Sequence, residues 1–251
     1  MTRLRVVSWN VHWGTAHVPG RPRNELFDPL VELGPDVLGA TDVVVFPEAW
    51  RSHNGESFLD GLAAHGLTNM VETSFTTLRI VGHNRRQLDD PGQGWWELAI
   101  ATRHPIVADA ELPLARSISD AVPQRHARSI RIDMGGREVD ITAFHVSSKL
   151  WYAAPWVQLR SLGQLVADAR VDGRDRPALL MGDANLWRTM IPFVLPGWRS
   201  TVRGATFPSW RPHSQIDHVL VRGEVDAVAG EVLPYSRTSD HRAISADLQL
   251  R

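Results

Sequence analysis

Short runs of apolar residues, separated by polar loops, are the dominant pattern along the chain. Residues 4–11, 43–46 and 178–181 are rich in Val and Leu, which predicts strands buried on both faces, the first of them near the centre of a sheet. Further strands are expected at 69–74, 76–82, 97–102, 215–221, 225–233 and 243–250. We expect the segment 225–233 to pair with 215–221. The clearest hairpin joins 127–133 to 137–146 through Gly135-Gly136.

Apolar residues at helical spacing predict helices between these strands. The longest, at 155–169, repeats Trp and Leu with a period that gives one buried face. Shorter helices are expected at 25–33, where Gly34-Pro35 follows, and at 57–65, where Gly66 follows.

These elements predict an α/β (α+β) fold in which two packed mixed β-sheets are flanked by helices. No linker, composition break or low-complexity tract divides residues 1–251, so one domain is expected. A regular alternation of strands and helices is missing, which argues against a barrel or a Rossmann fold.

Polar side chains recur where the predicted strands end. The positions are Asn10, Glu48, His145, Asp183 with Asn185, Asp217, and Asp240 with His241. One polar residue after a strand is ordinary turn chemistry, but turn chemistry alone does not readily produce six such ends in one chain. In extended backbone, residues two apart point to the same side, so Asp183 and Asn185 would project together. Asp217 lies in an apolar strand, where a carboxylate needs a partner, and His241 is the natural candidate.

These residue types match one kind of chemistry. Carboxylates and amide carbonyls are the ligands of hard cations such as Mg²⁺ or Mn²⁺. A histidine oriented by an aspartate can activate a water molecule. A cation, an oriented base and phosphate-binding groups together favour hydrolysis of a phosphodiester or a phosphomonoester.

The motifs that carry these residues are Ser-Trp-Asn-Val-His at 8–12, Pro-Glu-Ala at 47–49, Thr-Ala-Phe-His at 142–145, Gly-Asp-Ala-Asn at 182–185, Gln-Ile-Asp-His at 215–218 and Ser-Asp-His at 239–241. Their order resembles that of the endonuclease/exonuclease/phosphatase superfamily, and the resemblance covers residues 8–241. It implies a four-layer sandwich of the deoxyribonuclease I-like type and a metal-dependent phosphoric ester hydrolase.

The resemblance also implies roles for single residues. Glu48 resembles the main metal ligand, with Asn10 beside it, and Asp240 would lie on the metal or water side. Asp217 resembles the carboxylate that orients the catalytic histidine, which would be His241.

Asp183 and Asn185 resemble the pair that positions the attacking water and holds the phosphate. His145 matches a second histidine of the deoxyribonuclease and sphingomyelinase branches, which stabilises phosphate charge or the leaving group. Two positions stay open. His12 replaces an aspartate of the abasic-site nucleases, and Glu97 lies near a glutamate that pairs with the second histidine in the deoxyribonuclease branch.

The amino-acid composition excludes several kinds of site and narrows the possible functions. The 251 residues include no cysteine, which excludes disulfides, thiolate metal sites and a cysteine nucleophile. The formal net charge of -1 gives no general basic field, so a nucleic acid would be held by a local patch or a metal. No signal peptide or transmembrane run is seen, and a cytoplasmic protein is expected.

We therefore expect a Mg²⁺- or Mn²⁺-dependent phosphodiesterase that acts on a phosphate-ester substrate, with nucleic acid favoured. A phospholipid or phosphoinositide phosphohydrolase of the sphingomyelinase kind is the alternative, and a non-catalytic binding domain of the same fold is a third reading. Trp50, Trp187, Phe207 and Trp210 either pack loops or form a wall for a base or an acyl chain. The sequence leaves open endo- or exo-action, one metal or two, the oligomeric state and any partner protein.

Overall fold

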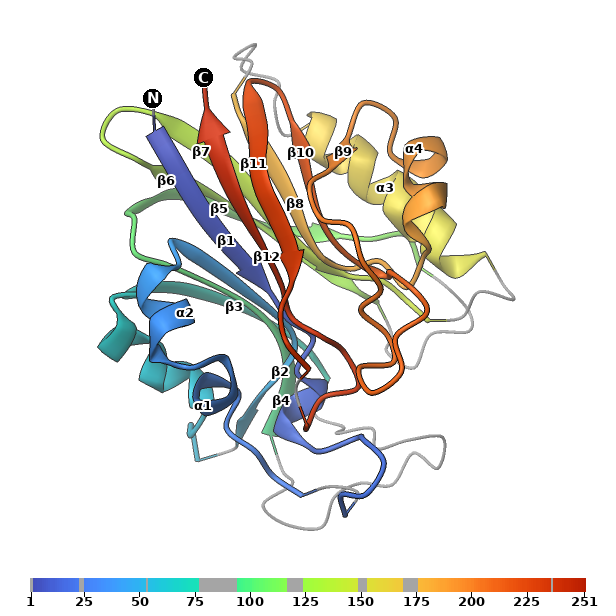
Figure 1. Cartoon of the computed structure of the whole chain (residues 1–251). Coiled ribbons are helices and arrows are strands. Elements are labelled where there is room, and N and C mark those ends of the chain that lie inside the picture. The colour runs from blue at the N-terminus through green and yellow to red at the C-terminus, as the bar shows by residue number, and fades with distance from the viewer. Residues whose placement is uncertain are drawn as a thin grey trace.

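Two sheets packed face to face form the centre of the protein. The computed structural model describes residues 2–22, 25–52, 54–76, 94–116, 124–148, 153–168, 176–235 and 237–251, without the side chains of 75 and 76. Within these residues each sheet has six strands, in the orders β11-β12-β1-β2-β4-β3 and β5-β6-β7-β8-β10-β9. Helices α1 and α2 lie outside the first sheet, and α3 and α4 lie outside the second (Figure 1).

The strands of the first sheet are β1 (Thr2–Ser8), β2 (Val43–Ser52), β3 (Asn69–Thr76), β4 (Gly94–Thr102), β11 (Val225–Val232) and β12 (Ile244–Leu250). Those of the second are β5 (Ile106–Pro113), β6 (His126–Asp133), β7 (Glu138–His145), β8 (Ala178–Asp183), β9 (Arg199–Ser200) and β10 (Asp217–Arg222). The α-helices are α1 (Pro29–Leu33), α2 (Pro35–Ala40), α3 (Ala154–Asp168) and α4 (Ile191–Val194). Short 3-10 helices occupy η1 (His12–Gly14), η2 (Phe58–His65) and η5 (Arg188–Met190).

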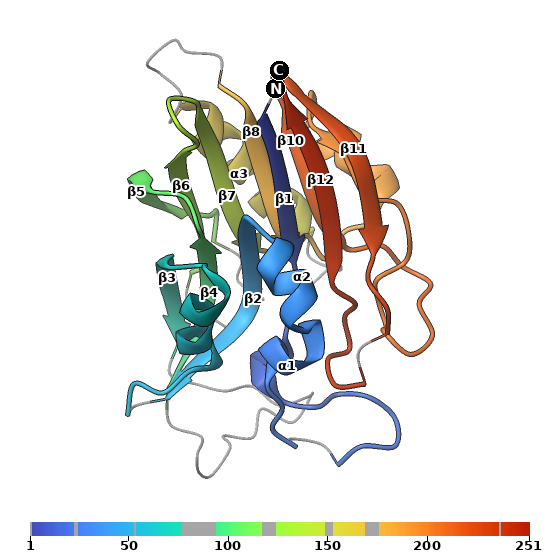
Figure 2. The ribbon, with the colours of Figure 1, turned by 60° about the vertical axis from the view of Figure 1, so that its left-hand side comes forward.

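Among the described residues three apolar cores hold the layers together, and a fourth, smaller cluster consists of Trp13, Trp50 and Trp96. The central core lies between the sheets and includes Val6, Ile141 and Met181, all fully or almost fully buried. One outer core packs α1, α2 and η2 on the first sheet, and the other packs α3 and α4 on the second. The order helix, sheet, sheet, helix confirms the predicted four-layer sandwich (Figures 1 and 2).

The first and last strands lie side by side in the first sheet. β1 runs antiparallel to β12, with Thr2 opposite Leu250 and Ser8 opposite Ile244, and parallel to β2 on its other side. The predicted position of the first strand near the sheet centre is therefore confirmed. Both ends of the chain lie at one pole of the sandwich (Figure 2).

The predicted pairing of 225–233 with 215–221 is wrong. Both edges of β10 are occupied, by β8 on one side and β9 on the other, so no edge remains for β11. The chain instead crosses to the other sheet after β10, and β11 pairs with β12, Val225 lying opposite Leu250. The exposed strand β5 is a further element that the apolar pattern did not indicate.

The predicted helix at 25–33 is shorter than expected. It begins at Pro29 because Asp28 caps it, the carboxylate accepting a hydrogen bond of 2.8 Å from Leu30 N. Gly34 ends it, but Pro35 then starts α2, since proline also suits a first helical turn. Of the strand expected at 76–82, only residue 76 belongs to the described part of the chain, as the last residue of β3.

Gly182 in β8 should tolerate no side chain. Its φ is +147°, and a Cβ atom there would lie 1.9 Å from Phe144 O on the neighbouring strand. Gly182→Ala is therefore expected to lower the free energy of unfolding by about 3 kcal/mol or more, measured by urea denaturation. Gly135→Ala is the control, because its φ is +75° in a turn with open space around it, and a cost of only about 1 kcal/mol is expected. Equal losses would contradict the role of the close strand contact.

Candidate active site

The strand register of the second sheet brings three predicted residues abreast. His145, the last residue of β7, lies opposite Asp183, the last residue of β8. Asp183 in turn lies opposite Asp217, the first residue of β10. All three side chains are almost fully buried. Adjacent strands that reach the same edge of a sheet thus place one histidine and two carboxylates together.

The first sheet contributes Asn10, which follows β1. Asn10 Nδ2 donates a hydrogen bond of 3.1 Å to Asp183 Oδ2, and this bond joins the two sheets at the site. Asn10 Oδ1 accepts from the backbone N–H of His12 at 3.1 Å, so both ends of the amide are held. His12, whose role the sequence left open, therefore lies at the edge of the site.

Glu48 enters the site from a distortion in β2. The register of β2 shifts between Phe46 and Ala49, and Glu48 has a φ of +57°, which is uncommon for a residue with a side chain. Its Oε1 lies 3.6 Å from His145 Nε2. Burial and the neighbouring charges of Asp240 and Asp183 raise the pKa of Glu48 to about 8, although His241 and Arg125 oppose this. A buried carboxylate among other carboxylates is a site that a cation would stabilise.

His241 is oriented by Asp217, as predicted. His241 Nδ1 lies 2.9 Å from Asp217 Oδ2 and 3.1 Å from Oδ1. Burial alone would lower the pKa of His241, but the carboxylates of Asp217, Asp183 and Asp240 outweigh it and raise that pKa well above its ordinary value. Its backbone is also fixed, since His241 O accepts from Trp9 Nε1 at 3.0 Å.

Asp183 lies at the centre of the cluster. Its Oδ2 is 3.8 Å from His241 Nε2 and 3.6 Å from His145 Nε2, while its Oδ1 accepts from Asn185 N at 2.8 Å. Burial and the charge of Asp217 raise the pKa of Asp183 to about 7, against the opposing effects of His241 and the two hydrogen bonds. A carboxylate that titrates near neutral pH suits proton transfer.

His145 and Asn185 complete the second-sheet side. Burial and the positive charges of Arg125 and His241 lower the pKa of His145 well below its ordinary value, so the ring is neutral. Asn185 has a φ of +45°, and its Nδ2 donates to Val146 O at 3.0 Å. The second hydrogen of that nitrogen remains available to a ligand.

Asp240 offers the oxygen best placed to bind a cation. Its Oδ1 is buried and accepts no hydrogen bond from the described residues. A buried carboxylate oxygen without a donor is costly unless something positive binds it. Together with Glu48 and the amide of Asn10, it gives an oxygen-rich set that fits Mg²⁺ or Mn²⁺. A buried group of Asp183, Asp217 and His241 also has the donor types of a metal site, but its atoms are already engaged with one another.

Comparison with known proteins agrees with this geometry. The model of the Endonuclease/Exonuclease/phosphatase family matches residues 7–241. The chain belongs to that family. Its members are metal-dependent phosphoric ester hydrolases, and this chain is one of them.

Solved structures of similar fold include other members of the endonuclease/exonuclease/phosphatase family. One from Beutenbergia cavernae is 25% identical with a TM-score of 0.73, covering 99% of this chain and 72% of that one. SmcL is 16% identical with a TM-score of 0.69, covering 98% and 99% of the two chains. Truncated TDP2 from Caenorhabditis elegans is 15% identical with a TM-score of 0.66, covering 98% and 97%. A comparison with curated proteins finds no match.

Trp96, not Glu97, faces His145 in this family member. The rings of Trp96 and His145 lie 5.6 Å apart, edge to face, and the Arg125 guanidinium lies 5.0 Å from the Trp96 ring. Arg125 Nη1 also donates to His145 O at 3.4 Å. Sequence reasoning missed both residues. The spacing of β4 could have indicated Trp96, but Arg125 precedes β6 and follows no motif.

Glu97 points to the opposite face of β4. There it accepts from Ser74 Oγ at 3.2 Å and lies 3.9 Å from Arg51 Nε. The guanidinium of Arg51 donates instead to Glu72 and Asp60. Burial and the adjacent Glu72 raise the pKa of Glu97 to about 8. The pairing of Glu97 with the second histidine, which the sequence left open, is therefore not found in the described part of the chain.

This raised pKa predicts a pH dependence of stability. Between its ordinary pKa and about 8, Glu97 holds its proton in the folded chain but loses it in the unfolded chain. The stabilisation is fully present below the ordinary pKa and is lost as the pH rises through 8. Glu97→Gln should therefore weaken the fall in melting temperature between pH 5 and pH 8, a window of about three pH units that lies between the two pKa values. An equally steep fall in the variant would contradict this protonation.

The four aromatic residues whose role the sequence left open divide into two groups. Trp50 is buried with Trp13 and Trp96 and serves packing, and Phe207 packs 5.0 Å from the His241 ring. Trp187 and Trp210 keep 55% and 40% of their surface exposed.

No helix in the described ranges is long and apolar enough to cross a membrane.

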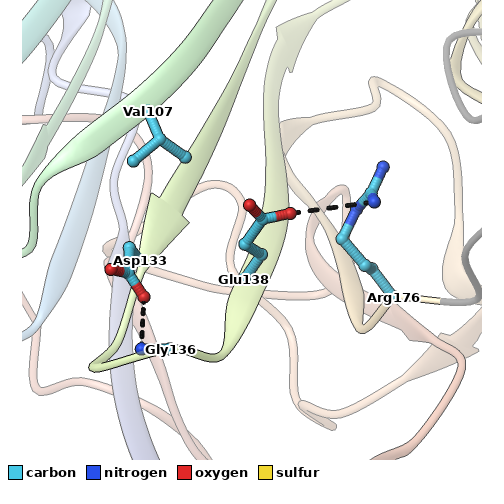
Figure 3. Close-up of a pocket in the computed structure, with 5 residues that line it drawn as sticks. All are labelled: Val107, Asp133, Gly136, Glu138 and Arg176. Carbon is cyan, nitrogen blue, oxygen red and sulfur yellow. Dashed lines mark hydrogen bonds and ion pairs between the residues drawn. The ribbon is translucent and has the colours of Figure 1, made fainter. Parts of the chain in front are cut away.

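A polar pocket of about 290 Å³ lies elsewhere, around the turn between β6 and β7. In Figure 3, Glu138 and Arg176 point toward each other across it, with 3.7 Å between Oε2 and Nη1, while Asp133 binds Gly136 N in the turn. Glu138 begins β7 and His145 ends it, so an extended strand of about 23 Å separates this pocket from the candidate active site.

Proposed function

We propose that this hydrolase is a Mg²⁺- or Mn²⁺-dependent phosphodiesterase. The observation that carries the proposal is the continuous chain of contacts from Asn10 through Asp183 and His241 to Asp217, with neutral His145 beside it. It contains a proton acceptor, an oriented histidine and neutral donors, which are the groups that attack on a phosphate requires.

Asp183 and His241 are the groups that handle the proton of the attacking water. Their facing atoms, Oδ2 and Nε2, lie 3.8 Å apart, close enough for one water to contact both. Asp217 acts as a positioning residue, because it holds Nδ1 of His241 and so directs Nε2 toward the reaction. Water loses its proton to this pair as its oxygen attacks phosphorus.

His145 and Asn185 are proposed to hold the phosphate oxygens. A neutral imidazole can donate from Nε2, and Asn185 Nδ2 has one hydrogen beyond its bond to Val146. Glu48, Asp240 and Asn10 would hold the cation, which when bound would neutralise phosphate charge and the developing charge of the reaction.

Nucleic acid is the favoured substrate. Trp187 follows Asn185 by two residues and is more than half exposed, so a base could stack on it beside the cleaved bond. The exposed Trp187 also suits a phospholipid headgroup or acyl chain, which is the alternative. A cytoplasmic location goes with the nucleic-acid assignment and stays a prediction.

A substrate panel tests the proposal. Purified protein with Mg²⁺ or Mn²⁺ is incubated with supercoiled plasmid, single-stranded DNA, RNA, sphingomyelin, phosphoinositides and a generic diester. Cleavage of a diester by the wild type but not by Asp183→Ala is expected. Cleavage of lipid alone would replace nucleic acid by phospholipid as substrate. If no diester is cleaved, or if Asp183→Ala keeps full activity, the phosphodiesterase assignment is wrong.

A further inference from the structure

Two histidines and an aspartate meet beside the catalytic cluster. One ring nitrogen each of His12 and His17 and one carboxylate oxygen of Asp240 lie within 4.8 Å of one another. The two rings are 4.6 Å apart. His12 is buried, whereas His17 and Asp240 are half-buried, so an ion from solvent can reach the group.

The hydrogen bonds of His12 fix its tautomer. Its Nδ1 lies 3.3 Å from Thr15 O and 3.1 Å from Thr15 Oγ1, and that hydroxyl already donates its own proton to His12 O. Both oxygens can therefore only accept from Nδ1, which must carry the proton. Nε2 keeps its lone pair. A histidine whose second nitrogen donates to a backbone carbonyl is typical of a metal ligand.

The loops that carry the three residues are tied together. His17 N donates to Thr238 O at 2.8 Å, which connects the loop after β1 to the loop before β12. Asp240 O accepts from Ser209 N at 2.7 Å. The buried Oδ1 of Asp240 meanwhile accepts nothing from the residues that the structure describes. The group is thus held by backbone contacts while one of its oxygens lacks a donor.

We propose that His12, His17 and Asp240 form a second divalent-cation site, which takes Zn²⁺ or a cation of similar softness. Two imidazoles and one carboxylate are a common Zn²⁺ ligand set, with a fourth position left for water or a substrate oxygen. Mg²⁺ prefers oxygen ligands throughout, so it is the weaker competitor here and the better fit for Glu48 and Asn10. The site shares Asp240 with the Mg²⁺ site proposed above, but His12 and His17 take no part in the proposed hydrolysis, so each proposal can fail without the other.

Calorimetric titration with Zn²⁺ in excess Mg²⁺ tests the site, with the absorption of bound Co²⁺ as a second readout. The wild type should bind one Zn²⁺ that Mg²⁺ does not displace. His17→Ala should weaken Zn²⁺ binding by more than about 100-fold, and Thr15→Val, which keeps the side-chain shape but removes the hydroxyl acceptor, by about tenfold. Thr15→Val tests the site even if His17→Ala is too unstable to be measured.

Two control variants distinguish this Zn²⁺ site from binding at other histidines and from the proposed hydrolytic site. His213→Ala removes an exposed histidine elsewhere and should leave Zn²⁺ affinity unchanged. Glu48→Gln should keep the Zn²⁺ site while phosphodiesterase turnover is lost, so the failure of one proposal is distinguishable from the failure of the other. Displacement of Zn²⁺ by Mg²⁺, or unchanged Zn²⁺ affinity in both His17→Ala and Thr15→Val, overturns the second site.

Discussion

His241→Ala is expected to lower kcat for phosphodiester cleavage by about 10²–10⁴-fold, the range that a positioned acid or base contributes. The alanine removes the nitrogen that faces Asp183 and leaves Asp217 without its partner. Asp217→Asn should approach the same loss, because an amide that donates to Nδ1 would force the proton onto Nε2. Steady-state kinetics with Mg²⁺ measure both variants.

A pH profile gives this prediction a sharper test. Asp183, with a pKa of about 7 before a cation binds, must be ionised to accept a proton, so kcat/KM should fall as the pH drops through its pKa. A bound cation lowers that pKa, which places the acid limb at or below pH 7. Asp183→Asn should remove the limb. Near-wild-type turnover in His241→Ala, with a normal melting curve, would exclude it from the chemistry.

Glu48→Gln should abolish Mg²⁺-dependent turnover and weaken Mg²⁺ binding by about 100-fold or more, since even indirect partners of a metal contribute 10–100-fold. Without a cation, Glu48→Gln should instead be more stable than the wild type at high pH. The pKa of Glu48 is raised to about 8, so its carboxyl stabilises the fold below its ordinary pKa and that stabilisation is lost as the pH rises through 8. Glutamine mimics the neutral form, and the metal-free variant should melt higher than the wild type above pH 8.

Thermal melting of the wild type and of Glu48→Gln, with and without Mg²⁺, measures both effects. Mg²⁺ should raise the melting temperature of the wild type but not that of Glu48→Gln. Glu97→Gln is the matched control, because it also replaces a buried glutamate with a raised pKa, on the face of β4 that points away from the site. Mg²⁺ should still stabilise that variant. An equal Mg²⁺ shift in Glu48→Gln would remove Glu48 from the cation site.

The contact between Asp217 and His241 could be predicted from the sequence, because the residues around each of them already indicate it. A carboxylate inside an apolar strand needs a partner, and Ser-Asp-His before a final strand offers one. The register of β7, β8 and β10 then follows from where their apolar runs end. His145, Asp183 and Asp217 meet because each is the first or last residue of its strand, and the apolar runs before His145 and Asp183 indicate two of these ends.

Other features depend on contacts that no local pattern records. Glu48 reaches the site through a bulge and a positive φ in β2, and Arg125 reaches it from a segment without a motif. The crossing from β10 to β11 resembled a hairpin, since only Gly223-Glu224 separates the strands. What decided against a hairpin was the occupation of both edges of β10 by strands distant in sequence.

The pairing of β1 with β12 has a consequence for synthesis on the ribosome. Thr2 finds its cross-strand partner only when Leu250 has left the exit tunnel, so one edge of β1 stays open until β12 has been made. An open apolar strand invites pairing with other nascent chains. Asp240 and His241 precede β12 by only a few residues, so the cluster that Asn10 and Asp183 begin is completed at about the time that β12 is made.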